Sequence, residues 1–88
     1  MDKYFLTLEK EVLREMTASI KASITHYLIK NEIAIDDVKE PMRILLNKVN
    51  KMSNSLIEKD YTMEELEQIK IKLQFIKEFT DEVEENDA

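Results

Sequence analysis

Glycine is absent from this chain, and Pro41 is its only proline. Backbone positions that require unusual φ/ψ angles are therefore scarce, because glycine is the residue that supplies most of them. The 88 residues are instead rich in Leu, Ile, Glu, Lys, Met and Ala, which favour helices. The sequence predicts an all-α fold.

The spacing of apolar residues divides the chain into three amphipathic segments with short joints between them. This spacing predicts helices over about 3–30, 38–56 and 63–82. Short connections place consecutive helices antiparallel, so we expect an up-down-up three-helix bundle over residues 1–80. Residues 81–88 are mostly acidic, and we expect them to form a frayed C-terminal tail.

The first helix is apolar on more than one side near its start. One line of apolar residues recurs at helical spacing and predicts the core face, while a second, shorter line consists of Leu6, Leu13 and, further on, Ala22 and Ile29. A helix of this kind is either buried between neighbours or keeps an apolar face for a partner. The first line consists of Phe5, Leu8, Val12, Met16, Ile20, Ile24, Tyr27 and Leu28.

The joint before the second helix contains residues that favour turns and caps. Asp37 and Glu40 stand three positions apart and resemble a capping box, and Pro41 is tolerated in a first helical turn. We therefore expect the second helix to begin close to Asp37.

The third helix has the clearest start signal in the chain. Thr62 and Glu65 have the spacing of a capping box, and Tyr61 can pack on Leu66. An additional apolar strip runs beside the expected core face. The core face consists of Leu66, Ile69, Leu73, Ile76 and Val83, and the strip of Ile71, Phe75 and Phe79.

The formal charge of −6 is concentrated at the C-terminal end. Residues 78–88 contain six acidic residues and no Lys or Arg, whereas the acidic and basic residues of 1–77 cancel. A neutral body without a basic stripe does not suit a nucleic-acid partner. No stretch reaches transmembrane length, no signal peptide is recognisable at the start, and Cys is absent. We therefore expect a cytoplasmic protein without a membrane partner.

The residue inventory offers little for catalysis. His26 is the sole histidine, so clusters of histidine metal ligands cannot form. A chain without glycine has no Gly-rich phosphate loop and no nucleophile elbow of the usual kind. We expect a protein that binds another protein, with no enzymatic activity, metal or cofactor.

Three segments together resemble a known family. Residues 11–20 read EVLREMTASI, residues 27–33 read YLIKNEI, and residues 61–66 read YTMEEL. In residue type and spacing these segments are similar to the epsilon antitoxins of epsilon/zeta toxin–antitoxin systems. The resemblance runs from residue 4 to about residue 83. The third helix departs from the family pattern, which is richer in aromatic residues where this chain has Ile71, Lys72 and Leu73.

This resemblance implies a three-helix bundle with a role in plasmid maintenance that neutralises a zeta-type toxin, a P-loop kinase that phosphorylates UDP-N-acetylglucosamine. In the family, the N-terminal helix lies over the nucleotide site and excludes ATP. Two antitoxins and two toxins commonly form a heterotetramer. Glu9, Glu11 and Glu15 offer carboxylates to the Lys and Arg residues of a phosphate site. We expect the toxin-binding residues to be Tyr4, Thr7, Leu8, Glu11 and Glu15.

Other small helical binders remain alternatives. A bacteriocin immunity protein or a phage-encoded inhibitor is also a short helical bundle, although immunity proteins are generally more basic than this chain. A structural module that completes a larger helical assembly is a third class. A zeta-like reading frame directly downstream would favour the antitoxin, and a bacteriocin precursor would favour the immunity protein.

Overall fold

The computed structural model describes residues 3–86, with side chains for residues 3–82. The described chain contains α1 (Lys3–Lys30), a 3₁₀ turn η1 (Ile35–Asp37), α2 (Met42–Glu58) and α3 (Met63–Asn86), and no strand. The predicted all-α class is confirmed.

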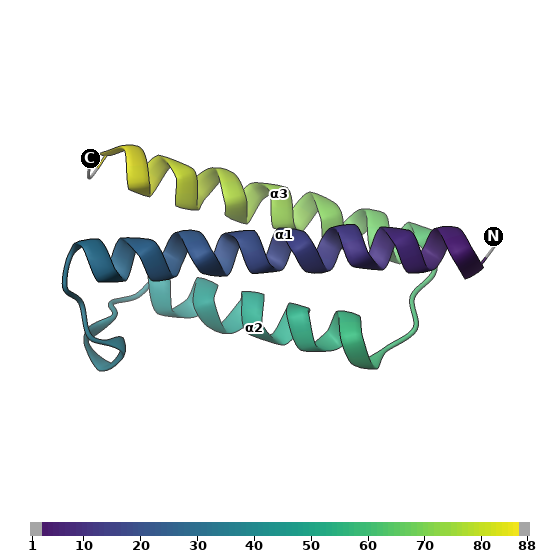
Figure 1. Cartoon of the computed structure of the whole chain (residues 1–88), viewed down its shortest axis with the longest axis horizontal. Coiled ribbons are helices and arrows are strands. Elements are labelled where there is room, and N and C mark those ends of the chain that lie inside the picture. The colour runs from purple at the N-terminus through teal and green to yellow at the C-terminus, as the bar shows by residue number, and fades with distance from the viewer. Residues whose placement is uncertain (1–2, 87–88) are drawn as a thin grey trace.

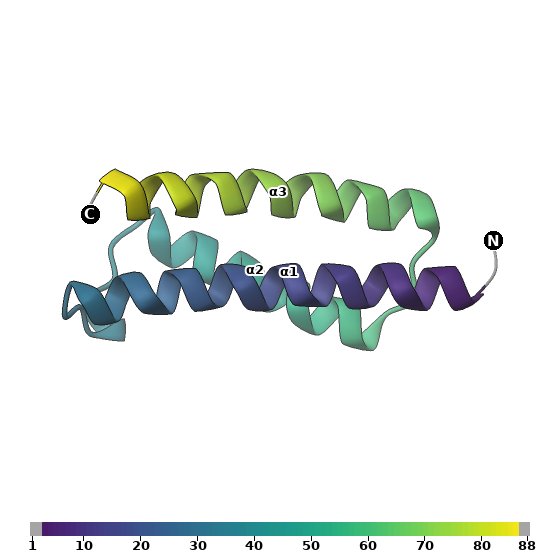
Figure 2. The ribbon, with the colours of Figure 1, turned by 45° about the horizontal axis from the view of Figure 1, so that its top comes forward.

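The helices form an up-down-up bundle with α1 at its centre (Figure 1). α2 runs antiparallel to α1, α3 returns parallel to it, and α1 packs against both. A turned view separates α3 from the α1–α2 pair (Figure 2). At about 1.5 Å per residue, the 28 residues of α1 extend about 42 Å, nearly the full 45 Å length of the molecule. α1 is therefore the element on which the other two helices assemble.

The core lies along the inner face of α1. Each helix buries apolar side chains there, and burying one such side chain contributes roughly 1.5–3 kcal/mol. The members of this cluster are Leu13, Ile20 and Ile24 of α1, Val49 and Leu56 of α2, and Leu66 and Leu73 of α3.

Two threonines are buried in the core as well. The Thr17 hydroxyl donates to the carbonyl of Arg14 at 2.7 Å, and the Thr80 hydroxyl donates to the carbonyl of Lys77 at 2.9 Å. These local bonds satisfy the hydroxyls, so burial leaves no unpaired donor. Neither threonine was predicted to lie in the core, because both are polar.

The core face of α1 differs from the predicted one in the N-terminal half. Phe5, Leu8 and Val12 are exposed, whereas Leu13 is fully buried and Leu6 packs against the core. Both apolar lines have the same helical period, so periodicity alone cannot say which one faces α2 and α3. Leu6 and Leu13 of the second line lie in phase with Ile20 and Ile24 and therefore face the core, whereas Ala22 and Ile29 of that line are exposed.

α1 ends in a motif that usually contains glycine. Glu32 has a positive φ of 54°. Its N–H donates to the carbonyl of Ile29 at 3.1 Å, and the N–H of Ile33 donates to the carbonyl of Leu28 at 2.9 Å. This is the Schellman pattern, with Glu32 in the left-handed position. The bonds satisfy carbonyls that the end of the helix would otherwise leave unpaired.

α2 begins at Met42, later than the predicted start near residue 38, and the predicted capping box at Asp37 and Glu40 is wrong. Asp37 ends the 3₁₀ turn, and the Glu40 carboxylate accepts a bond from Arg43 at 2.8 Å. The residue before a proline is disfavoured in the α region. This preference opposes extension of α2 back through Glu40, and the helix begins at Met42.

The start of α3 follows the sequence pattern closely. The N–H of Thr62 donates to the Glu65 carboxylate at 2.9 Å, and the N–H of Glu65 donates to the Thr62 hydroxyl at 3.2 Å, so the capping box is confirmed. Tyr61 packs against the core cluster, and its hydroxyl shares a hydrogen bond with Ser55.

The end of α3 lies beyond its predicted end. The helix continues to Asn86, so the backbone of residues 81–86 is helical where a frayed tail was expected. The rest of that tail, residues 87 and 88, and the side chain of Val83 lie outside what the structure describes.

Candidate protein-binding site

The N-terminal half of α1 presents one face away from the core. Tyr4, Leu8, Glu11 and Glu15 follow one another at intervals of four, three and four residues, which places them on a single side of a helix. Tyr4 is 62% exposed, Leu8 is 40% exposed, and both glutamates are exposed. We call this surface the outer face of α1. Four of the five predicted binding residues lie together on it.

Thr7, the fifth predicted residue, lies at the edge of the outer face. It is exposed, and its hydroxyl donates to the carbonyl of Lys3 one turn earlier at 2.9 Å. Phe5 and Val12, which were not among the predicted binding residues, add exposed apolar surface beside the outer face of α1. Phe5 packs edge-on against the Tyr4 ring with centroids 5.6 Å apart, and Val12 is exposed one turn after Leu8.

Glu11 and Glu15 also border a shallow hollow of about 460 Å³ between α1 and α2. Neither carboxylate has an ion-pair partner among the described side chains. A cation of a partner can therefore bind them without first displacing an internal contact. The remaining lining residues are Arg14, Thr17, Ala18, Lys21, Ser53 and Ile57.

Two polar contacts attach this half of α1 to the rest of the bundle. The Lys10 ammonium donates to the carbonyl of Lys59 at 2.8 Å, in the joint between α2 and α3. The Lys70 ammonium of α3 lies 3.9 Å from a buried oxygen of Glu9. Glu9 was expected to face a partner alongside Glu11 and Glu15, but it points toward α3 instead.

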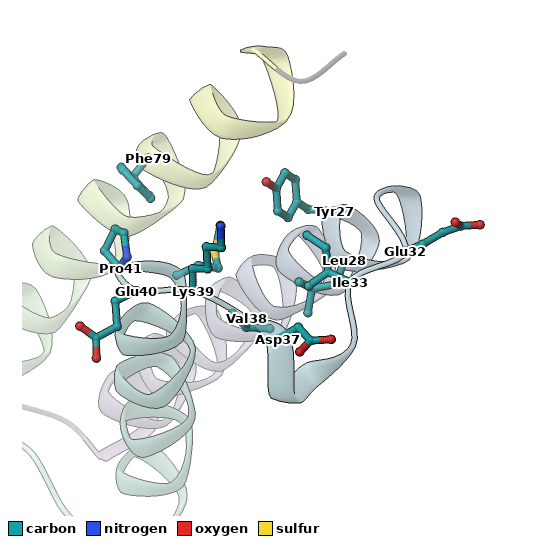
Figure 3. Close-up of a pocket in the computed structure, with 11 residues that line it drawn as sticks. Tyr27, Leu28, Glu32, Ile33, Asp37, Val38, Lys39, Glu40, Pro41 and Phe79 are labelled. Carbon is teal, nitrogen blue, oxygen red and sulfur yellow. The ribbon is translucent and has the colours of Figure 1, made fainter.

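A larger cavity, of about 580 Å³, lies at the opposite end of the bundle (Figure 3). The end of α1, the joint and the start of α2 line it together with Phe79 of α3, and the Lys39 side chain extends between the Phe79 and Tyr27 rings. Most of the exposed surface that lines it is apolar, and its charged side chains have both signs. These charges do not single out an anionic or a cationic small ligand. The charged lining residues are Glu32, Asp37, Lys39 and Glu40.

The described residues also offer no cluster for metal chemistry. Within residues 3–86, no three His, Asp or Glu side chains are arranged so that they could hold a metal ion. None of the described helices combines the length and the apolar character needed to cross a membrane. Four of the five predicted binding residues lie on the outer face of α1.

A comparison with protein families gives this surface a context. The family model described as bacterial epsilon antitoxin matches residues 2–83. The chain belongs to this family. Searches among curated proteins and among solved structures give no match. The predicted resemblance is confirmed, and the chain is an antitoxin, with a toxin as its partner in a toxin–antitoxin pair.

For an antitoxin, exposed apolar side chains that the core does not need are the natural place to look for partner contacts. Apolar residues on more than one side of α1 near its start already indicated, in the sequence, an apolar surface kept for a partner. The sequence also contained the signal for the Ile71, Phe75 and Phe79 strip of α3. All three side chains of that strip are exposed in the structure.

Proposed function

We propose that this antitoxin neutralises a zeta-type toxin, a P-loop kinase that phosphorylates UDP-N-acetylglucosamine, by laying the outer face of α1 over its ATP site. The observation that carries this proposal is the exposure of Tyr4 and Leu8 next to the exposed carboxylates of Glu11 and Glu15. The fold needs none of these four side chains for its core. Antitoxin family membership supports a binding role for a surface of this kind.

The chemistry of the face suits a nucleotide site. A kinase that binds ATP keeps Lys and Arg side chains for the phosphates, and carboxylates pair strongly with both. Glu11 and Glu15 would bind these cations in place of phosphate oxygens. Tyr4 and Leu8 would cover apolar surface near the site, and Thr7 would contact the toxin at the edge of the face.

We further propose how the antitoxin acts and assembles. The antitoxin acts by binding alone, without catalysis or a cofactor, in the cytoplasm. Two copies combine with two toxins in a heterotetramer, and the pair serves plasmid maintenance. Since the outer face uses only α1, other surfaces of the bundle stay available for contacts within such an assembly.

Co-expression with the zeta-type kinase encoded beside the antitoxin tests this function. We expect the two chains to co-purify and the complex to bind no ATP, whereas the kinase alone binds ATP. Absence of a complex, with the kinase still toxic, would contradict the proposal.

A further inference from the structure

α3 carries an apolar strip on its outside that the core does not use. Ile71, Phe75 and Phe79 follow one another at intervals of four residues, and all three are exposed. Phe75 has 68% of its surface exposed, an unusual position for a phenylalanine. At about 1.5 Å per residue the strip extends about 12 Å along the helix. We call these three residues the α3 strip.

The α3 strip lies among acidic side chains. Glu67, Glu78 and Glu82 are exposed on the same helix and have no ion-pair partner among the described side chains. Lys72, directly after Ile71, is exposed as well, and the ion pairs that α3 forms among the described side chains use Lys70 and Lys77. The charge beside the strip is therefore mixed and net negative. An apolar strip with free carboxylates beside it suits a partner surface that combines apolar side chains with Lys or Arg.

The same charges oppose a second copy of this chain as the partner. A symmetric contact would place the α3 strip of one copy on that of the other, because a two-fold interface uses the same patch twice. Each copy would then contribute three carboxylates and the Lys72 ammonium, so the contact would join two patches of net negative charge, which is unfavourable. The charge pattern therefore favours a different, basic partner.

The α3 strip begins close to the outer face of α1. α1 and α3 run parallel and side by side (Figures 1 and 2), and the contact between Glu9 and Lys70 fixes their register. Val12 lies one turn after Glu9 and Ile71 directly after Lys70, and both are exposed. A partner on the outer face of α1 therefore needs to extend only from one helix to its neighbour to reach the α3 strip.

The far end of the α3 strip borders the cavity of Figure 3. Phe79 is a lining residue of this cavity, together with carboxylates of the joint between α1 and α2. A cavity of about 580 Å³ beside an exposed aromatic residue gives an apolar side chain of a partner a place to insert. The charged side chains of the lining have both signs, so this end of the contact rests on the apolar part of the lining.

We propose that the α3 strip is a second contact surface for the same toxin that the outer face of α1 binds. This inference rests on the proposed function. Stable interfaces use roughly 20–30 residues on each side, and five residues of α1 supply only part of that number. The toxin meets the α3 strip with an apolar surface bordered by Lys or Arg side chains, and it inserts a side chain beside Phe79.

The second contact can be tested by measuring how tightly the antitoxin and its variants bind a catalytically inactivated zeta-type kinase from the same operon. Phe75→Ser should weaken binding about tenfold or more, because exposed aromatic contacts dominate interfaces of this kind. Glu78→Lys should also weaken binding, and the loss should be larger at low salt than at high salt, because the effect of this substitution is electrostatic. Ile29→Ser is the matched control, since Ile29 is 70% exposed on α1 outside both surfaces and its loss should change binding less than about threefold.

The outcomes separate the two proposals. If wild type binds the kinase and Phe75→Ser binds it equally well, the α3 contact is overturned and the proposed function still stands. Absence of wild-type binding would overturn both. Sedimentation of the free chain adds one further outcome: self-association that Phe75→Ser abolishes would assign the strip to a second copy and overturn the inference. Equal unfolding temperatures of wild type and variants confirm that only binding has changed.

Discussion

The two halves of α1 have the same inner face and different outer faces. In both halves the inner face buries aliphatic side chains, Leu13 in the first and Ile20 and Ile24 in the second. The outer face of the first half carries Tyr4 and Leu8, exposed although they are large and apolar. The corresponding part of the second half consists mostly of small or polar residues: Ala18, Ser19, Ala22, Thr25 and His26.

This difference distinguishes the side chains that α1 uses for folding from those that we propose for binding. A bundle that needed only to fold would carry small or polar residues along the whole outer side, as the second half mostly does. The large apolar residues of the first half stabilise little while they are exposed, and they raise the risk of aggregation. Their position next to free carboxylates is what a surface for a partner requires.

The largest effect that we predict contrasts an inner with an outer leucine. Leu13→Ala should lower the free energy of unfolding by about 2–5 kcal/mol, because it leaves a cavity in the core. Leu8→Ala should lower it by less than about 1 kcal/mol, because Leu8 is already 40% exposed. Thermal or urea unfolding measures both. Equal losses would contradict the distinction between the two faces.

A second prediction compares the two halves of the outer face directly. Leu8→Glu should weaken toxin binding by about tenfold or more, because it places a charge in the expected apolar contact. Ala22→Glu introduces the same charge on the outer side of the second half and should leave binding within about threefold. Titration calorimetry with the inactivated kinase gives both constants. Similar losses for the two variants would mean that the binding surface extends over all of α1.

A third prediction, with a smaller expected effect, concerns a substitution that should lower the stability of the bundle without changing its affinity for the toxin. Thr62→Ala removes the capping hydroxyl at the start of α3 and should lower the free energy of unfolding by about 1 kcal/mol. In a domain of this size that corresponds to about 4–8 °C in the unfolding temperature. The toxin affinity of the folded chain should stay the same. A large loss of affinity would mean that this helix start contacts the toxin.

The smallest effect concerns the contact that attaches α1 to α3. Glu9→Gln should change the free energy of unfolding by no more than about 1 kcal/mol, because the pair with Lys70 is 3.9 Å long and partly exposed to solvent. Chemical unfolding at low and high salt measures it. A loss several times larger would show that this pair, rather than apolar packing, holds the first half of α1 in place.

Sequence patterns predicted much of this fold because most local signals agree with it. Helical periodicity gave the three helices, and the capping residues Thr62 and Glu65 located the start of α3. The start of α2 was mispredicted because the spacing of Asp37 and Glu40 imitates a capping box, whereas Pro41 disfavours helical backbone at Glu40.

The faces of the helices were harder to predict than their extents. Two apolar lines on α1 have the same period, and only the packing of α2 and α3 selects the one that contains Leu13. Thr17 and Thr80 were missed as core residues because their hydroxyls bond to their own helices, which spacing does not reveal. The binding role of the outer face stays a prediction, since residue patterns show which side chains are exposed but not what covers them.

The central claim is that the outer face of α1 serves neutralisation and not folding. The double variant Tyr4→Ala with Glu11→Ala tests it most directly, because both side chains are exposed and lie on that face. Growth of cells that express the kinase, together with the unfolding temperature of the purified antitoxin, is the measurement. We expect the variant to fold with an unchanged unfolding temperature and to protect the cells less well than wild type. Full protection by a folded double variant would contradict the account.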